Sequence, residues 1–130
     1  MKLGDVVSRI TIDSRKLTEY ALDPDNPVGR HKAYVFERTL GFTKNHWTLL
    51  AEQIEMLALA GEAVLRHTDN HGSHDSVDLE VTGLQGQQAV VRSGWLVTSG
   101  RDEARLTTLY VRKRITYVYN RQIHEDLTPK

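Results

Sequence analysis

The spacing of apolar residues changes once along this chain, and that change constrains the fold more than any other feature. Between residues 15 and 61 the apolar residues recur every three to four positions, which is the period of an α-helix. From Glu62 onward they alternate with polar residues, which is the period of a β-strand with one buried face. A chain whose helices precede its strands forms an α+β domain. We therefore predict N-terminal helices packed on one face of an antiparallel β-sheet meander.

Two short helices are predicted before residue 42. Ser14 is a good N-cap residue, so the first helix should begin at Arg15 and end at Leu22. The segment 23–27 contains two prolines, which cannot continue that helix. The second helix should run over residues 29–40, followed by a glycine at position 41 as its C-terminal stop.

A third helix has the clearest periodicity. Asn45 can cap its start and Gly61 can end it. Its apolar residues form a single stripe that must pack on another layer: Trp47, Leu50, Ala51, Ile54, Leu57 and Ala58.

The second half of the chain predicts strands separated by glycine-containing turns. Asp69 to His74 is polar and should be a loop, whereas residues 83–86 and 99–102 carry the glycines of tight turns. Together with a short N-terminal strand, the predicted strands are 6–13, 62–68, 77–82, 88–98 and 106–119.

The length of 130 residues suits a single domain, for which we expect a core over about 6–119 and a loose tail over 120–130. The chain has no cysteine, so we expect a reducing, cytoplasmic environment. No apolar run follows the N-terminus or is long enough to span a bilayer, so neither a signal peptide nor a membrane partner is expected.

The charge is balanced overall but uneven along the chain. Seventeen Lys and Arg residues match seventeen Asp and Glu residues, which disfavours a generic nucleic-acid binder. Basic residues nevertheless predominate after Gly100. A neutral protein can carry one basic face, and a solvated sheet surface is an equally good interpretation of the same pattern.

Several motifs resemble those of a family of small bacterial domains. They begin with Lys16-Leu17-Thr18 and Tyr20, continue with Pro24, Pro27 and Gly29, and include Lys32-Ala33 and Leu40-Gly41-Phe42. The turn 83–86, the valine-rich strand ending at Trp95 and the segment 105–110 are similar to later motifs of that family. The similarity covers about residues 10–111.

Members of that family occur at the tips of polymorphic toxins, on phage head proteins and alone. This context, with helices preceding an antiparallel sheet, is similar to the barnase/RelE-like ribonuclease toxins, although a shared fold does not define a function. One departure matters for the chemistry that this resemblance implies. Relatives often carry Tyr-Gly-x-Lys where this chain has His71-Gly72-Ser73-His74.

Cleavage of RNA without a metal needs a base for the ribose 2′-hydroxyl, an acid for the leaving 5′-oxygen and a stabiliser of the phosphorane charge. Arg30, His31 and Lys32 lie at a predicted helix start, where free N–H groups and the helix dipole favour a phosphate. The alternative for Lys32 is a structural role at the carbonyls near Pro24 and Pro27. Lys16 is predicted at the rim of the site.

Thr107 and Thr108 are adjacent, so in a regular strand they point to opposite faces, and Thr107 shares its face with Arg105. Arg92 and Arg105 lie on neighbouring strands and are expected to converge on an open sheet face. The alternative is cross-strand pairing with acidic neighbours.

His67, His71 and His74 cluster with Asp69 and Asp75. This spacing is compatible with a metal site, but it is also typical of a solvated polar turn. We favour the turn, with His74 as a general acid or base, since histidine titrates near neutral pH.

Two functions follow as hypotheses. The first is a toxin-like, metal-independent ribonuclease with Lys32, His74, Arg105 and Thr107 as catalytic residues and Arg30, His31, Arg92 and Lys16 binding the RNA. The second is a non-catalytic binding module, such as an adaptor, an immunity protein or a phage accessory protein, whose partner is a protein. Neither hypothesis calls for a cofactor or a metal, and neither predicts an oligomeric state.

Overall fold

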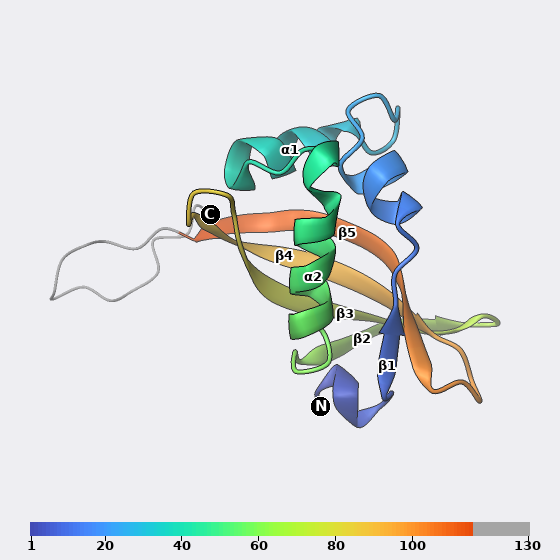
Figure 1. The fold of residues 1–130 in the computed structure, drawn as a ribbon. Helices are drawn as coiled ribbons and strands as arrows, with labels where there is room; N and C mark the ends of the chain where they lie inside the picture. Colours follow the sequence, from blue (N-terminus) through green and yellow to red (C-terminus); the bar gives the residue numbers. More distant parts are fainter. Residues whose placement is uncertain (116–130) are drawn as a thin grey trace, which may run out of the picture.

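The computed structural model describes residues 1–115 and confirms the predicted α+β class. Two helices, α1 (Arg30–Leu40) and α2 (Trp47–Leu57), cover the same side of a curved sheet (Figure 1). The sheet has five strands, which are β1 (Arg9–Thr11), β2 (Ala63–Asp69), β3 (Gly72–Thr82), β4 (Gln88–Val97) and β5 (Glu103–Ile115). Their order in the sheet is β1-β5-β4-β3-β2, and β2 to β5 form an antiparallel meander. None of the helices within residues 1–115 has the length and apolarity needed to cross a bilayer.

The strands agree with the predicted alternation but not with all of the predicted bounds, since β1 is shorter than predicted and β3 and β5 begin earlier. The predicted loop over residues 69–74 is a tight turn, so His74 lies within a strand. The turn is short because Gly72 adopts a φ of 138°, a value that side chains disfavour.

The short strand β1 pairs with β5 in parallel, which the sequence did not predict. Side-chain hydrogen bonds stabilise this pairing. Ser8 donates to the Asp102 carboxylate from its hydroxyl and from its backbone N–H, the latter at 2.9 Å to Oδ1, and the Thr11 hydroxyl donates to Glu103. β1 pairs only with the first residues of β5, and Figure 1 shows it at the edge of the sheet, below the helices.

The first predicted helix is present over residues 15–21 but is irregular. Residues Leu17–Ala21 form a π-helical segment, in which the Leu22 N–H donates to the Leu17 carbonyl at 2.9 Å. The helical residues begin at Arg15 as predicted, and the Ser14 carbonyl accepts the N–H groups of Leu17 and Thr18 at 2.9 Å each. The side chain that accepts an N–H at this start is that of Asp13, whose carboxylate lies 3.0 Å from the Arg15 nitrogen.

The third helix, α2, has His46 at its N-cap position, one residue after the predicted cap, and it ends at Leu57, before the predicted stop at Gly61. Thr43 caps the 3₁₀ turn Lys44–His46 that precedes α2, and its side chain accepts the Asn45 N–H at 3.3 Å.

The second helix, α1, has the predicted bounds, and Gly41 ends it with a φ of 79°. Its buried face and that of α2 pack on the apolar face of the sheet, where Trp95 is fully buried. The core already begins at Leu3, which is completely buried, so the boundary predicted at residue 6 was too late. The predicted boundary at 119 and the tail over 120–130 lie outside the described residues.

Two irregularities interrupt the pairing of β4 with β5. Gly94 pairs with Thr108 and Trp95 with Leu106, so Thr107 is an extra residue in β5. Arg112 is a second extra residue, between the pairs Val91–Val111 and Val90–Lys113. Such bulges bend a strand and redirect its side chains, and the first of them lies at the candidate site.

Candidate functional site

The face of the sheet opposite the helices carries a pocket of about 370 Å³. Gly94 on the central strand β4 lacks a side chain, which leaves space between the strands on either side. The lining residues come from all four strands of the meander: Arg66, His67, His74, Asp75, Ser76, Arg92, Gly94, Trp95, Thr107, Thr108 and Tyr110.

The Thr107 bulge forms one wall of this pocket. In a regular strand Thr107 and Thr108 would face opposite sides, as predicted, but the extra residue allows both to line the pocket. The prediction that they face opposite sides was therefore wrong. A Cβ atom on Gly94 would lie 2.5 Å from Cγ2 of Thr108, so the bulge and the glycine depend on each other.

Lys32 reaches this wall from α1. Its ammonium group bonds to the hydroxyl of Tyr20 and lies 3.3 Å from Oγ1 of Thr108. It also lies 4.6 Å from the ring centroid of Tyr20 and 5.5 Å from that of Tyr110. No ion pair within residues 1–115 joins Lys32 to a carboxylate. The ammonium is thus held by hydroxyls and aromatic faces, with its charge available to an anion.

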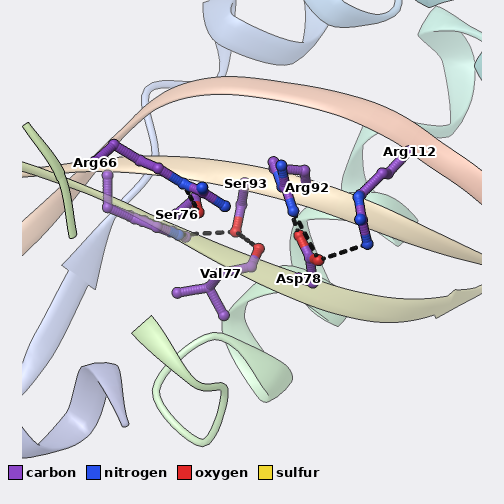
Figure 2. Close-up of polar contacts among 8 residues, drawn as sticks. Arg66, Ser76, Val77, Asp78, Arg92, Ser93 and Arg112 are labelled. Carbon is purple, nitrogen blue, oxygen red and sulfur yellow. Dashed lines mark hydrogen bonds and ion pairs between the residues drawn. The ribbon is translucent and has the colours of Figure 1, made fainter. Parts of the chain in front are cut away.

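The opposite wall is made by the β2–β3 hairpin. Arg66 donates from Nε to Oγ of Ser76 at 2.7 Å, and Figure 2 shows its guanidinium lying over β3. His74 bonds through Nε2 to Oδ2 of Asp69 at 2.9 Å. The rings of His67 and His74 stack with centroids 4.1 Å apart.

Arg92 closes one end of the pocket but is engaged by a carboxylate. Its Nε and Nη2 donate to Asp78 at 2.8 and 3.1 Å, and Arg112 donates to the same carboxylate at 3.2 Å (Figure 2). The hydrogen bond from Arg92 is the main reason that the pKa of Asp78 lies below its usual range. Cross-strand pairing, the alternative raised for Arg92, is therefore present.

Arg105 and Arg92 do not converge. His74, Leu96 and Arg105 form one cross-strand row, so Arg105 lies on the same face as His74 but with Leu96 between them. Arg105 lines a separate hollow with Arg101 and Glu103. Four positions along β4 separate its row from that of Arg92, a distance of about 13 Å.

Arg30, His31 and Lys32, which were predicted to form one phosphate site at the start of α1, do not lie together at the pocket. Arg30 and His31 are exposed and do not line the pocket, since consecutive helical residues point in different directions. Asn26 already occupies the helix start, where its side-chain oxygen accepts the N–H groups of Val28 and Gly29 at 2.8 Å each. Lys16 is exposed and lies outside the pocket.

Asp75 lines the pocket although only 9% of it is exposed. Its Oδ1 atom is buried with no hydrogen-bond partner within residues 1–115. Burial raises the pKa of this carboxyl. Sequence analysis had assigned Asp75 to a polar loop, because the strand containing it was predicted to begin at residue 77.

Arg66 and Thr108 were likewise absent from the predicted site. Nothing in the local sequence distinguishes Arg66 from other exposed arginines, because a register shift in β2 decides where it points. For Thr108, the signal was the glycine at position 94, but the cross-strand partner of that glycine is known only from the register.

These features define the protein as an α+β domain with a polar pocket on the open face of its sheet. Residues 2–113 match the family model described as a domain of unknown function, DUF6883, and the chain belongs to this family. The comparison with curated proteins found no match. The search of solved structures found none either.

Proposed function

We propose that the pocket on the open face is the site of a metal-independent ribonuclease of the toxin type. The observation that carries the proposal is the placement of cationic, imidazole and hydroxyl groups around Gly94. Lys32, Thr107 and Thr108 lie on one side of it, and Arg66 and His74 lie on the other. A phosphate bound over Gly94 would therefore have donors on two opposite sides.

The proposed reaction uses these two sides differently. His74, oriented by Asp69, takes the proton of the ribose 2′-hydroxyl. The 2′-oxygen attacks phosphorus, and the bond to the 5′-oxygen breaks to leave a 2′,3′-cyclic phosphate. Lys32 stabilises the phosphorane charge and gives a proton to the leaving 5′-oxygen. Attack and departure occur in line, so a base and a donor on opposite walls suit this chemistry.

The other predicted residues take smaller parts in this proposal. Thr107 donates a hydrogen bond from the pocket wall, and Arg92 contributes charge that Asp78 partly neutralises. Arg105 contacts RNA beyond the pocket, in the same cross-strand row as His74 but on the far side of Leu96. Arg30, His31 and Lys16 lie outside the pocket and provide charged controls.

The test is incubation of the purified protein with total RNA, with and without a chelator. We expect cleavage that the chelator does not abolish, and products that end in a 2′,3′-cyclic phosphate. Lys32→Met and His74→Asn should each lower the rate by about 10²–10⁴-fold. Lys16→Met, which removes an exposed cation, should leave the rate unchanged.

Absence of cleavage by the wild-type protein would contradict the proposal, as would an equal loss in Lys16→Met. In cells, expression of the wild-type chain should arrest bacterial growth, and Lys32→Met should relieve that arrest.

A protein-binding role is the second candidate, favoured by an apolar hollow between α2 and the β3–β4 turn. Leu49, Met56 and Leu84 line it, and Met56 is 78% exposed. An adaptor, an immunity protein or a phage accessory protein would use such a surface for its partner. Growth that is indifferent to the wild-type protein, together with intact RNA in the cleavage assay, would favour this role.

A further inference from the structure

We propose that the β2–β3 hairpin binds one divalent transition-metal ion of the zinc class through His67, Asp69 and His74. The inference depends on the geometry of this cluster and goes beyond the proposed cleavage of RNA. An imidazole that holds a metal through Nε2 keeps its proton on Nδ1, so the metal-bound protein cannot use His74 as a base, and the metal-free protein is the form that would cleave RNA. It replaces the simple polar turn that the sequence favoured for the same residues.

The hairpin places the three side chains on one face. His67 and Asp69 are two positions apart on β2, so they point to the same side of the sheet. His74 is the cross-strand partner of His67 on β3. The three residues therefore come from a paired, antiparallel ladder, which holds potential ligands more rigidly than a loop does.

A register shift creates this arrangement. Leu65 pairs with Asp75, but the next pair is His67 with His74, so Arg66 is an extra residue in β2. In a regular ladder Arg66 would lie opposite His74, and a cation would take the place of the second imidazole. The bulge thus brings two imidazoles side by side and directs Arg66 to Ser76 instead.

The separations of the candidate ligand atoms suit a small ion. Oδ2 of Asp69 lies 2.9 Å from Nε2 of His74 and 3.9 Å from Nε2 of His67, and one ligand atom from each residue lies within 4.8 Å of the others. Bonds of about 2.0–2.2 Å in tetrahedral geometry place zinc ligands about 3.4 Å apart. The two separations from Oδ2 bracket that value. The rings of His67 and His74 stack within 9° of parallel, so metal binding requires at least one ring to turn until both ring planes meet at the ion, and the 60% exposure of the His67 side chain leaves room for that turn.

Neighbouring groups orient the Asp69 carboxylate as a metal ligand. The backbone N–H of His71 donates to Oδ1 of Asp69 at 2.9 Å, which leaves Oδ2 directed at the histidines. The side chains of His67, Asp69 and His74 are 60%, 37% and 24% exposed, so an ion can reach them from solvent. Water can complete the coordination.

The donor set selects the metal. Two imidazoles and one carboxylate suit zinc, copper, nickel or cobalt, whereas magnesium and calcium prefer sites built from oxygen ligands. The chain has no cysteine, so a thiolate site is not possible.

The test is titration of the full, untagged chain with Co²⁺, followed by visible absorption, and with Zn²⁺, followed by calorimetry. We expect one equivalent of each metal to bind to the wild-type protein, with no comparable binding of Mg²⁺. His67→Asn and Asp69→Asn should each weaken binding at least about tenfold, because each removes one ligand. Both substitutions are at exposed positions, and circular dichroism will verify their folding.

His71→Asn is the matched control, because it removes an imidazole from the same turn without removing a proposed ligand. It should bind Co²⁺ as the wild type does. The proposal is overturned if the wild type binds neither metal, if His71→Asn weakens binding as much as His67→Asn does, or if neither ligand substitution has an effect. As a readout that needs no substitution, Zn²⁺ should shift the ring ¹⁵N resonances of His67 and His74 but not those of His31.

Discussion

At the scale of single residues, Asp75 and Asp78 lie three residues apart on β3 but have opposite environments. Asp75 is buried and its Oδ1 has no partner within residues 1–115, whereas Asp78 accepts hydrogen bonds from Arg92 and Arg112. Burial raises the pKa of Asp75, and hydrogen bonding to Arg92 lowers the pKa of Asp78. The two carboxylates should therefore affect stability with opposite signs.

Asp75→Asn should stabilise the protein at pH 7 by about 1–2 kcal/mol, because a neutral amide of the same shape is cheaper to bury than a carboxylate. A raised folded-state pKa means that the contribution of Asp75 is most favourable below its unfolded pKa of about 3.9 and is lost as pH rises through the folded value. The advantage of asparagine should therefore shrink toward pH 4. Urea unfolding at pH 7 and pH 4 measures it, and a destabilised variant at pH 7 would refute this account.

Asp78→Asn should destabilise the protein at pH 7 by about 1–2 kcal/mol, since it weakens charge-assisted hydrogen bonds. A lowered folded-state pKa means that the stability from Asp78 is present above its unfolded pKa and is lost as pH falls through the folded value. The same urea measurements at lower pH should show the difference between wild type and variant disappearing. An equal difference at every pH would be inconsistent with the charge as its origin.

At the scale of elements, the pairing of β4 with β5 depends on the fit between Gly94 and the Thr107 bulge. We expect Gly94→Ala to cost about 1–3 kcal/mol, because its Cβ would overlap Cγ2 of Thr108. Thr108→Ser removes that methyl group and keeps the hydroxyl that contacts Lys32. The double variant should therefore recover much of the loss, which thermal unfolding of all three variants will show. Additive losses would mean that the two side chains do not interact.

Helices and strands could be predicted where residues close together in the sequence determine them. Gly29, Gly41 and the apolar stripe between them were enough to locate α1, and alternation was enough to locate the meander. The bulges at Arg66 and Thr107 were not predictable, because a bulge arises from the fit between two strands and leaves little trace in either one. The site residues that sequence reasoning missed lie next to these bulges.

At the scale of the whole molecule, a formal net charge of zero conceals an uneven distribution. Arg66 and Arg92 line one pocket, and Lys32 contacts Thr108 in its wall. If the proposed function is correct, RNA binding at this pocket should depend on salt despite the neutral total charge. Three contacts to single-stranded RNA predict a slope of about −2 for the logarithm of the binding constant against the logarithm of the salt concentration.

Fluorescence anisotropy with a short labelled RNA measures this slope, and Lys32→Met should reduce it by about 0.7. A slope near zero would show that the pocket does not bind phosphates, whatever the outcome of the cleavage assay.

The sequence alone determined the fold class, the order of the elements and the location of α1, because helix periodicity, strand alternation and glycine stops act over a few residues. It also placed Lys32 among the residues of interest. Only the tertiary structure decided which side chains share a pocket. The parallel pairing of β1, the bulges in β2 and β5 and the contact of Lys32 with Thr108 depend on residues that lie apart in the chain. Such contacts depend on strand register, and a shift of one residue changes every partner on a face.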